Sequence, residues 1–272
     1  MPELPEVETV RRGLEPLLVG RTLTGAEVRI DGLRWPVAGN LGELLAGRLI
    51  HTVGRRAKYL LIGCDGGTVI LHLGMTGRLQ VVPETLPAGR HDHVDLLLDD
   101  GWRLRFHDPR RFGAILWTPA DPHQHPLLME MGTEPFAVEM NGDYLYFRSR
   151  GRTIAVKTFI MDQKILVGVG NIYASEALFR ARIAPAKEAG RVSLERYGRL
   201  AEAIRVVLGE AIAAGGTTIR DFRGEDGRPG YFKRQLKVYG REGEPCYACG
   251  RPIRQERLGQ RSTYFCGHCQ KN

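Results

Sequence analysis

The sequence Cys246-Tyr247-Ala248-Cys249 is followed, after sixteen residues, by Cys266-Gly267-His268-Cys269. Two Cys-x2-Cys pairs at this spacing let four thiolates converge on one tetrahedral Zn²⁺, while the segment between them forms a hairpin. A pair of disulfides is the alternative, but only one other cysteine, Cys64, is present and nothing else indicates an oxidising compartment. We expect one structural zinc, because four sulfur ligands leave no open position for water or substrate.

The predicted zinc hairpin belongs to a basic chain. The net charge is +8 over 272 residues, and a basic surface attracts polyanions. The hairpin itself carries a run of guanidinium groups, which suit contacts with phosphates. These are Arg251, Arg254, Arg257 and Arg261. With 43% hydrophobic residues the chain can also bury a core, and its length suits two modest domains plus the hairpin.

The N-terminus lacks the features of a signal peptide. Glu3, Glu6 and Glu8 stand where such a peptide needs an apolar run, with Arg11 and Arg12 just beyond. No stretch of the chain approaches the ~20 apolar residues of a membrane span. We therefore expect a soluble, intracellular protein, in which reduced thiols favour zinc.

The first half, residues 1–130, is predicted to be an N-terminal β-sandwich domain with a leading helix, and a β-barrel is the alternative arrangement of its strands. The helix is expected from Pro5 to Leu14, because Pro5 suits a first helical position, apolar residues share one face, and Pro16 should stop it. Asp100-Gly101 between two apolar runs is a hairpin signal. The predicted strands are Glu27–Ile30, Tyr59–Ile62, Thr68–His72, Leu79–Val82, Val94–Leu98, Trp102–Phe106 and Ala114–Trp117.

From about Arg152 the pattern becomes helical, which makes the expected fold class α+β. Helices are predicted over 154–163, 172–183 and 193–214, where Ser193 can cap the last helix and Gly215-Gly216 can stop it. Residues 216–230, rich in glycine, are predicted to form a loop. The helical region is expected to span 131–232, and the zinc hairpin 233–272.

The turn Gly168-Val169-Gly170-Asn171 joins the first two of these helices. Its glycines permit a close backbone approach, and the next helix begins with N–H groups at its positive end. A DNA phosphate could dock on these amides and on the Asn171 side chain. A plain helix–turn–helix packing unit is the alternative, and spacing alone does not separate the two.

Several motifs, taken together and in order, closely resemble the bacterial formamidopyrimidine-DNA glycosylases, also called 8-oxoguanine DNA glycosylases. The resemblance runs from residue 2 to the last cysteine. The motifs are Pro2-Glu3-Leu4-Pro5-Glu6, Lys58-Tyr59-Leu60-Leu61, His72-Leu73-Gly74-Met75-Thr76-Gly77, His107-Asp108-Pro109-Arg110-Arg111-Phe112-Gly113, and Met161-Asp162-Gln163 ahead of Gly168–Tyr173, followed by the four cysteines.

The resemblance implies that removal of Met1 exposes the secondary amine of Pro2, which attacks C1′ of the damaged nucleotide and forms a Schiff base. An α-amine is less basic than a lysine side chain, so more of it is uncharged at neutral pH. Glu3 would protonate the ring oxygen of the sugar, which requires a carboxyl shielded from water. Lys58 would assist β-elimination, and Arg261 the second, δ-elimination.

The resemblance also implies DNA contacts in both halves of the chain. Met75, Arg110 and Phe112 would fill the space left by an extruded base, as two apolar wedges and a guanidinium that addresses the orphaned cytosine. The other implied contacts are His91, Arg152 and Asn171, with Lys157 near the lesion. Arg148 and Arg150 could exchange roles with Arg152. Residues 131–232 would be a helix-two-turn-helix domain with a lesion-recognition loop at 216–230.

The implied function is a monomeric, bifunctional DNA glycosylase and AP lyase of base-excision repair. It would excise oxidised purines from double-stranded DNA in the bacterial cytoplasm, associated with the nucleoid, with one zinc and no organic cofactor. The related endonuclease VIII, which prefers oxidised pyrimidines, is an alternative, but that group usually begins Pro-Glu-Gly-Pro-Glu where this chain has Leu4. A non-catalytic zinc-hairpin protein that only binds DNA is a second alternative.

Overall fold

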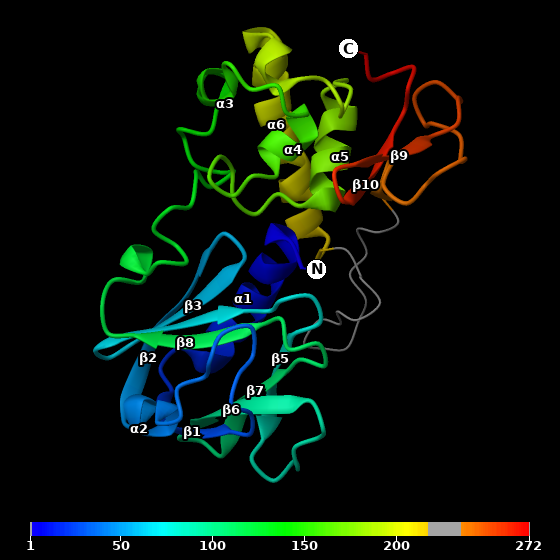
Figure 1. The fold of residues 1–272 in the computed structure, drawn as a ribbon. Helices are drawn as coiled ribbons and strands as arrows, with labels where there is room; N and C mark the ends of the chain where they lie inside the picture. The colour runs from blue at the N-terminus through cyan, green and yellow to red at the C-terminus, as the bar shows by residue number, and fades with distance from the viewer. Residues whose placement is uncertain (1, 217–234, 272) are drawn as a thin grey trace. The chain divides into compact units, whose positions relative to one another are not determined.

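The computed structural model describes residues 2–216 and 235–271, and these form two compact units (Figure 1). The N-terminal unit holds residues 2–129 with Gly215 and Gly216, and the C-terminal unit holds residues 130–214 and 235–271. Met1 lies outside the described residues, and so does the predicted loop 216–230 except for Gly216.

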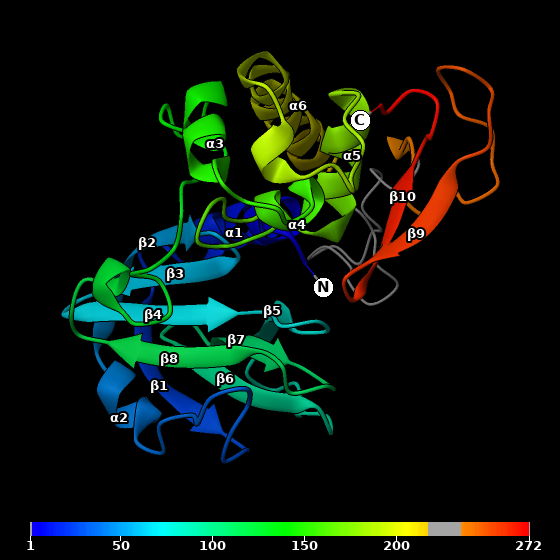
Figure 2. The same ribbon diagram turned by 45° about the horizontal axis from the view of Figure 1, so that its top comes forward.

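The N-terminal unit contains one long helix and an antiparallel sheet of eight strands in the order β5-β7-β6-β1-β2-β3-β4-β8 (Figure 2). As predicted, Asp100-Gly101 connects two neighbouring strands, β6 and β7. The elements are α1 (Leu4–Leu18), β1 (Thr22–Val28), α2 (Leu41–Leu45), β2 (Arg48–Arg56), β3 (Tyr59–Cys64), β4 (Gly67–His72), β5 (Arg78–Pro83), β6 (Asp92–Leu98), β7 (Trp102–His107), β8 (Ala114–Thr118) and η1 (Pro122–Gln124).

This sheet has two halves, because β1 and β2 pair over a short stretch, Thr22 with Leu49 and Leu23 with Arg48. One half is β5-β7-β6-β1 and the other is β2-β3-β4-β8. A single hydrophobic core takes residues from both halves and from α1. The expected α+β fold class, with a sheet domain at the N-terminus, is confirmed.

Three local predictions for this unit were wrong. Helix α1 continues through Pro16 to Leu18, because a proline in the last turn removes only one backbone hydrogen bond while Leu14 and Leu18 are buried. Strand β1 lies earlier than the predicted Glu27–Ile30. Strand β2 was missed because only two of its side chains, Ile50 and Val53, are buried, so its sequence shows no clear alternation.

The C-terminal unit consists of four α-helices around a second core, followed by a two-stranded hairpin. Within this core the rings of Phe159 and Tyr197 meet edge to face, 6.1 Å between centroids. The elements are α3 (Gly142–Ser149), α4 (Val156–Ile160), α5 (Asn171–Arg180), η2 (Ala189–Arg191), α6 (Leu194–Ala213), β9 (Arg254–Leu258) and β10 (Arg261–Phe265).

The three predicted helices are present as α4, α5 and α6, but the first two are shorter than predicted. Helix α4 begins at Val156, since the N–H groups of Val156 and Lys157 bond to the carbonyls of residues 187 and 185 instead. Helix α5 ends at Arg180, because Arg182 has a left-handed φ of 57°. The predicted cap of α6 is confirmed: the Ser193 hydroxyl accepts the N–H of Arg196 at 3.3 Å.

Helix α3 has no counterpart among the predicted helices. It packs against α6, although the exposed side of α3 carries an apolar side chain, Phe147, which blurs its amphipathic pattern. None of the helices formed by residues 2–216 and 235–271 is long and apolar enough to cross a lipid bilayer.

Candidate functional site

The four cysteines predicted to bind zinc converge at one point of the C-terminal unit. Their Sγ atoms all lie within 4.8 Å of one another, with Cys246 and Cys269 4.0 Å apart and Cys249 and Cys266 3.5 Å apart. Sulfur atoms that share one tetrahedral zinc at about 2.3 Å are about 3.8 Å apart, so the arrangement fits this metal. All five cysteines of the chain are described and all are free thiols, which excludes the disulfide alternative.

The zinc site shapes the hairpin of β9 and β10 that lies between the two cysteine pairs. Gly259-Gln260 forms the turn, where Gly259 has a left-handed φ of 59°. Arg261 is the first residue of β10, pairs with Leu258 across the hairpin, and is exposed. Arg254 and Arg257 on β9 are exposed as well, so the hairpin presents several guanidinium groups to solvent.

A buried lysine connects this hairpin to the turn before α5. Lys157 is 2% exposed, and its ammonium group donates to Asn171 Oδ1 at 2.7 Å, Thr263 Oγ1 at 2.8 Å and the Ser262 carbonyl at 3.2 Å. Asn171 also donates from Nδ2 to the Ser262 carbonyl, at 3.0 Å. Lys157 therefore fixes Asn171 and the strand next to Arg261, while its contact with a lesion stays a prediction.

A pocket lies beside Arg261, between α4 and the hairpin of β9 and β10. Its volume is about 340 Å³, and its lining includes Lys157 and Met161 on the α4 side and Gly259 and Arg261 on the hairpin side. Gly168, in the turn before α5, has a left-handed φ of 79°, as the predicted glycine turn requires. The pocket lining thus includes the cationic Arg261, which suits a phosphate-bearing ligand, together with the acidic Asp162.

Glu176 holds the segment that leads into the hairpin, a role that sequence reasoning missed. Its carboxylate accepts the backbone N–H groups of Lys237, Val238 and Tyr239 at 2.8–2.9 Å. Burial raises the pKa of Glu176, although these three hydrogen bonds act in the opposite direction. A glutamate within an otherwise apolar helix gave no signal of this role, because its partners lie about sixty residues away in the sequence.

In the N-terminal unit, Pro2 and Glu3 are both buried at the start of α1. Glu3 is the N-cap residue and is 3% exposed, and its backbone N–H donates to Glu6 Oε2 at 2.8 Å. The backbone of Gly216 lies against Glu6, since a Cβ at Gly216 would be 3.2 Å from Glu6 Oε1. The carboxyl of Glu3 is therefore shielded from water, as the proposed proton donor requires.

Lys58 lies in the two-residue turn between β2 and β3, and it is 5% exposed. The preceding Ala57 has a left-handed φ of 54°, which is uncommon for a residue with a Cβ and marks a constrained turn. The Ala57 carbonyl accepts a hydrogen bond from the Arg55 guanidinium at 2.8 Å. The backbone on the N-terminal side of Lys58 is thus held in one conformation.

His72 interacts electrostatically with Lys58. Sequence reasoning did not single it out as a site residue. Burial, together with the positive charge of Lys58, lowers the pKa of His72 to about 4, so the ring is neutral at physiological pH. The neutral ring accepts the N–H of Gly74 on Nδ1 at 3.0 Å and packs on Tyr59 at 4.6 Å between centroids. It thereby orders the loop that carries Met75.

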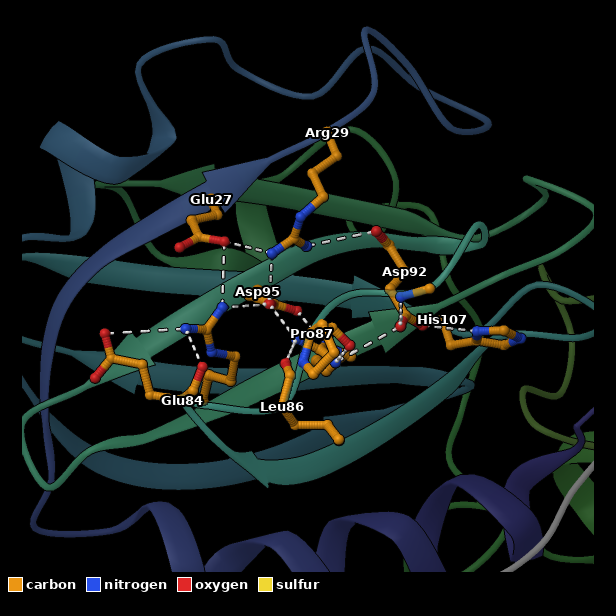
Figure 3. Close-up of polar contacts among 11 residues, drawn as sticks. Glu27, Arg29, Glu84, Leu86, Pro87, Asp92, Asp95 and His107 are labelled. Carbon is orange, nitrogen blue, oxygen red and sulfur yellow. Dashed lines mark hydrogen bonds and ion pairs between the residues drawn. The ribbon is translucent and has the colours of Figure 1, made fainter.

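The predicted DNA contact His91 follows a loop that a buried ionic cluster holds in place (Figure 3). At its centre, Asp95 is fully buried and accepts hydrogen bonds from Arg29, Arg103 and Arg105 at 2.7–3.0 Å. Burial acts to raise the pKa of Asp95, but these hydrogen bonds outweigh burial and lower the pKa to about 2. The cluster is therefore charged at all physiological pH values.

The same arginines bind the backbone of the loop between β5 and β6. Arg105 donates to the carbonyls of Leu86 and Pro87, both at 3.0 Å, and Arg103 donates to the Glu84 carbonyl at 2.8 Å. The His91 ring then meets the His107 ring edge to face, 5.9 Å between centroids. Three anchored carbonyls fix the chain just before His91, so the imidazole has a defined position.

Met75, Arg110 and Phe112 lie on two loops of the N-terminal unit. Met75 is 38% and Phe112 44% exposed, and the Arg110 guanidinium lies 4.9 Å from the centroid of the Phe112 ring. The structure thus places all three residues in loops and not in the β-core. Their contact with DNA stays a prediction.

Arg152 and its two neighbours are partly engaged within the C-terminal unit. Arg152 donates from Nε to the Arg148 carbonyl at 3.0 Å and lies 5.8 Å from the Phe159 ring. Arg148 donates to the Lys164 carbonyl at 3.0 Å, and Arg150 donates to the Val192 carbonyl at 3.0 Å. Each of the three guanidinium groups thus has a partner within the unit, and these bonds do not select one of them as the DNA contact.

Three family models match successive parts of the chain. The model described as the formamidopyrimidine-DNA glycosylase N-terminal domain matches residues 1–115, and the formamidopyrimidine-DNA glycosylase H2TH domain matches residues 131–223. The zinc finger found in FPG and IleRS matches residues 243–272. Together these matches cover most of the chain.

Individual relatives are similar over the full length. The formamidopyrimidine-DNA glycosylase of Syntrophotalea carbinolica is 59% identical over 271 residues, which cover 100% of both chains. The crystal structure of the MutM (Fpg) protein from Thermus thermophilus is 41% identical, with a TM-score of 0.88 over 99% of this chain and 98% of that one. Fpg from Lactococcus lactis, solved with Fapy-dG containing DNA and with abasic site containing DNA, is 31% identical, with a TM-score of 0.89 over 99% of this chain and 100% of that one. This chain belongs to the formamidopyrimidine-DNA glycosylase family.

Proposed function

We propose that this chain is a bifunctional DNA glycosylase and AP lyase of base-excision repair that removes oxidised purines, namely 8-oxoguanine and formamidopyrimidines. The observation that carries the proposal is the burial of Pro2 and Glu3 side by side at the start of α1. Once Met1 is removed, this is a secondary amine next to a carboxyl shielded from water, a nucleophile with a proton donor. The complexes of the Lactococcus lactis relative with Fapy-dG containing DNA and with abasic site containing DNA support the formamidopyrimidine and abasic-site substrates.

The first stage of the proposed reaction replaces the damaged base by Pro2. The nitrogen of Pro2 attacks C1′, the bond between C1′ and the base breaks, and the base leaves with the electron pair and takes up a proton. Glu3 donates a proton to the sugar ring oxygen, and the bond from C1′ to that oxygen breaks. The nitrogen, which has lost its own proton, then forms a double bond to C1′, giving a cationic Schiff base.

The second stage cuts the strand on both sides of the sugar. The Schiff base makes the hydrogens on C2′ acidic, and loss of one of them expels the 3′ phosphate as the β-elimination. A second elimination then expels the 5′ phosphate. We assign Lys58 to the first elimination and Arg261, on the zinc hairpin, to the second, where a guanidinium can hold a departing phosphate with two hydrogen bonds.

Contacts with the duplex are divided among the parts of the chain. Met75, Arg110 and Phe112 fill the space of the extruded base, and His91 binds DNA beside them. Arg152 and Asn171 bind the DNA backbone, and Lys157, which donates to Asn171, lies near the lesion. We divide the chain into a catalytic domain (1–130), a helix-two-turn-helix domain (131–232) and a zinc hairpin (233–272) that holds one structural zinc. We place the enzyme, as a monomer, in the bacterial cytoplasm with the nucleoid.

Cleavage of defined duplexes tests this function. We expect a strand with 8-oxoguanine opposite cytosine to be cut to a gap with phosphate on both ends. This cleavage should be about tenfold or more faster than cleavage of a strand with an oxidised pyrimidine. A tenfold difference in rate corresponds to ~1.4 kcal/mol of transition-state binding, which one or two specific contacts with the base can supply. Denaturing electrophoresis resolves the ends. Preference for the pyrimidine lesion would favour an endonuclease VIII type of enzyme, and tight binding without cleavage would favour a non-catalytic DNA-binding protein.

A further inference from the structure

Asp108, in the loop after β7, is fully buried and lies between the loops that carry Met75, Arg110 and Phe112. We propose that Asp108 is the positioning residue that fixes these three side chains relative to one another, and so sets how the enzyme fills the vacated space and reads the orphaned base. This inference rests on the proposed function, in which the three side chains enter DNA.

The carboxylate of Asp108 connects the two loops directly. Its Oδ1 accepts the hydroxyl of Thr76, the neighbour of Met75, at 2.7 Å. Its Oδ2 accepts the N–H of Gly113, the neighbour of Phe112, at 2.8 Å, and Oδ1 also accepts the N–H of Arg110 at 3.3 Å. Each of the three predicted DNA-contacting residues is therefore within one residue of a bond to this single carboxylate. Bonds to a charged acceptor are stronger than those between neutral groups.

The main chain of Asp108 extends the connection to His91 and to strand β6, which begins at the next residue. The N–H of Asp108 donates to the His91 carbonyl at 3.0 Å, and the Asp108 carbonyl accepts His93 Nε2 at 2.9 Å. The same carbonyl accepts the N–H of Arg111, which has a left-handed φ of 58° and reverses the chain before Phe112. Asp108 thus bonds to all three segments of the N-terminal unit that carry a predicted non-catalytic DNA contact. These are the segments of Met75, of Arg110 with Phe112, and of His91.

Close backbone packing makes the two loops move as one body. A Cβ at Gly74 would lie 2.4 Å from the carbonyl carbon of Phe112, and a Cβ at Gly113 would lie 2.7 Å from the His72 carbonyl oxygen. Only glycine fits at both points. The bases of the loops are therefore fixed, while the Met75 and Phe112 side chains at their tips remain exposed.

A buried aspartate that only stabilises the fold would affect every activity of the enzyme alike. A positioning role predicts something narrower, because only steps that need the vacated space to be filled depend on the relation of the two loops. Opening and cutting of an abasic sugar in a single strand requires no filling. The cross-loop bond from Thr76 is the one contact whose removal leaves the turn around Asp108 intact, since the bonds from Arg110 and Gly113 persist.

The test compares Thr76→Val with Thr118→Val, a control in the same unit that also loses a turn hydrogen bond, from Ala120 N–H to the Thr118 hydroxyl at 3.3 Å. We expect Thr76→Val to slow single-turnover excision of 8-oxoguanine opposite cytosine by about tenfold and to lower the preference for cytosine over adenine opposite the lesion by a similar factor. Borohydride trapping on a single-stranded abasic oligonucleotide should stay within about twofold of wild type. Thr118→Val should match wild type in all three assays.

Asp108→Asn should show the same pattern with a larger effect, and Thr76→Val keeps the test decisive if that variant does not fold. Thr76→Val activities that equal those of Thr118→Val, or that fall in parallel on duplex and single-stranded substrates, would overturn the positioning role while leaving the proposed function in place. Failure of wild-type protein to form any trapped adduct would instead reject the proposed function itself.

Discussion

Glu3→Gln is expected to lower the single-turnover rate of 8-oxoguanine excision by about 10²–10⁴-fold, the usual contribution of a positioned proton donor. Glutamine keeps the size of the side chain, and the backbone N–H that donates to Glu6 is unchanged. The N–H groups of the amide are far too weakly acidic to protonate the sugar ring oxygen. Affinity for a lesion-bearing duplex should therefore change little, and rapid-quench kinetics with a parallel binding titration separate the two quantities.

Glu15→Gln is the matched control, because Glu15 lies on the same helix but is half exposed and pairs only with Arg11 among the described residues. Its rate should equal that of wild type, since an exposed ion pair contributes little. A Glu3→Gln enzyme that excises 8-oxoguanine within a few-fold of the wild-type rate would exclude Glu3 as the proton donor.

Loss of zinc through Cys266→Ala should abolish the arginine hairpin and weaken duplex binding by on the order of a hundredfold or more. The hairpin has a small core of its own, made of Val238, Ile253 and two of the cysteines. So few apolar residues cannot hold a fold without the metal. Arg261 would then lose its fixed position, and δ-elimination should fail along with tight binding.

Cys64→Ala is the control for this experiment. Cys64 is buried in the core of the N-terminal unit and does not belong to the four-cysteine group, and burial raises the pKa of its thiol to about 11, which disfavours the reactive thiolate. Metal analysis should find one zinc per chain in wild type and Cys64→Ala and none in Cys266→Ala. A zinc-free Cys266→Ala protein that still binds the duplex at wild-type affinity would show that the hairpin is dispensable.

Much of the fold could be predicted because the relevant signals are local. The cysteine spacing identified the zinc ligands, the short β-like runs located most strands, and Ser193 with Gly215 bounded α6. Pro16 and β2 show the limits of such rules. Whether a helix continues past a proline in its last turn, or a strand forms with only two buried side chains, depends on packing against distant parts of the core. A short stretch of sequence does not contain that information.

The supporting residues of the site could not be predicted for the same reason. Thr76 and Asp108 are 32 positions apart, and Lys157 reaches Thr263 across 106 positions. The sequence placed Lys157 among the DNA contacts, which stays a prediction, but it gave no sign of the three internal hydrogen bonds through which Lys157 holds Asn171 and the hairpin. Motif residues indicate the chemistry of the site from the sequence alone. The residues that position them can be identified only in the folded structure.

Borohydride reduction during incubation with an 8-oxoguanine duplex, followed by peptide mapping, identifies the nucleophile of the reaction. We expect a single covalent adduct whose DNA is attached to the nitrogen of Pro2 in a chain that has lost Met1. An adduct mapped to Lys58, or no adduct from protein with a processed N-terminus, would exclude Pro2 as the nucleophile.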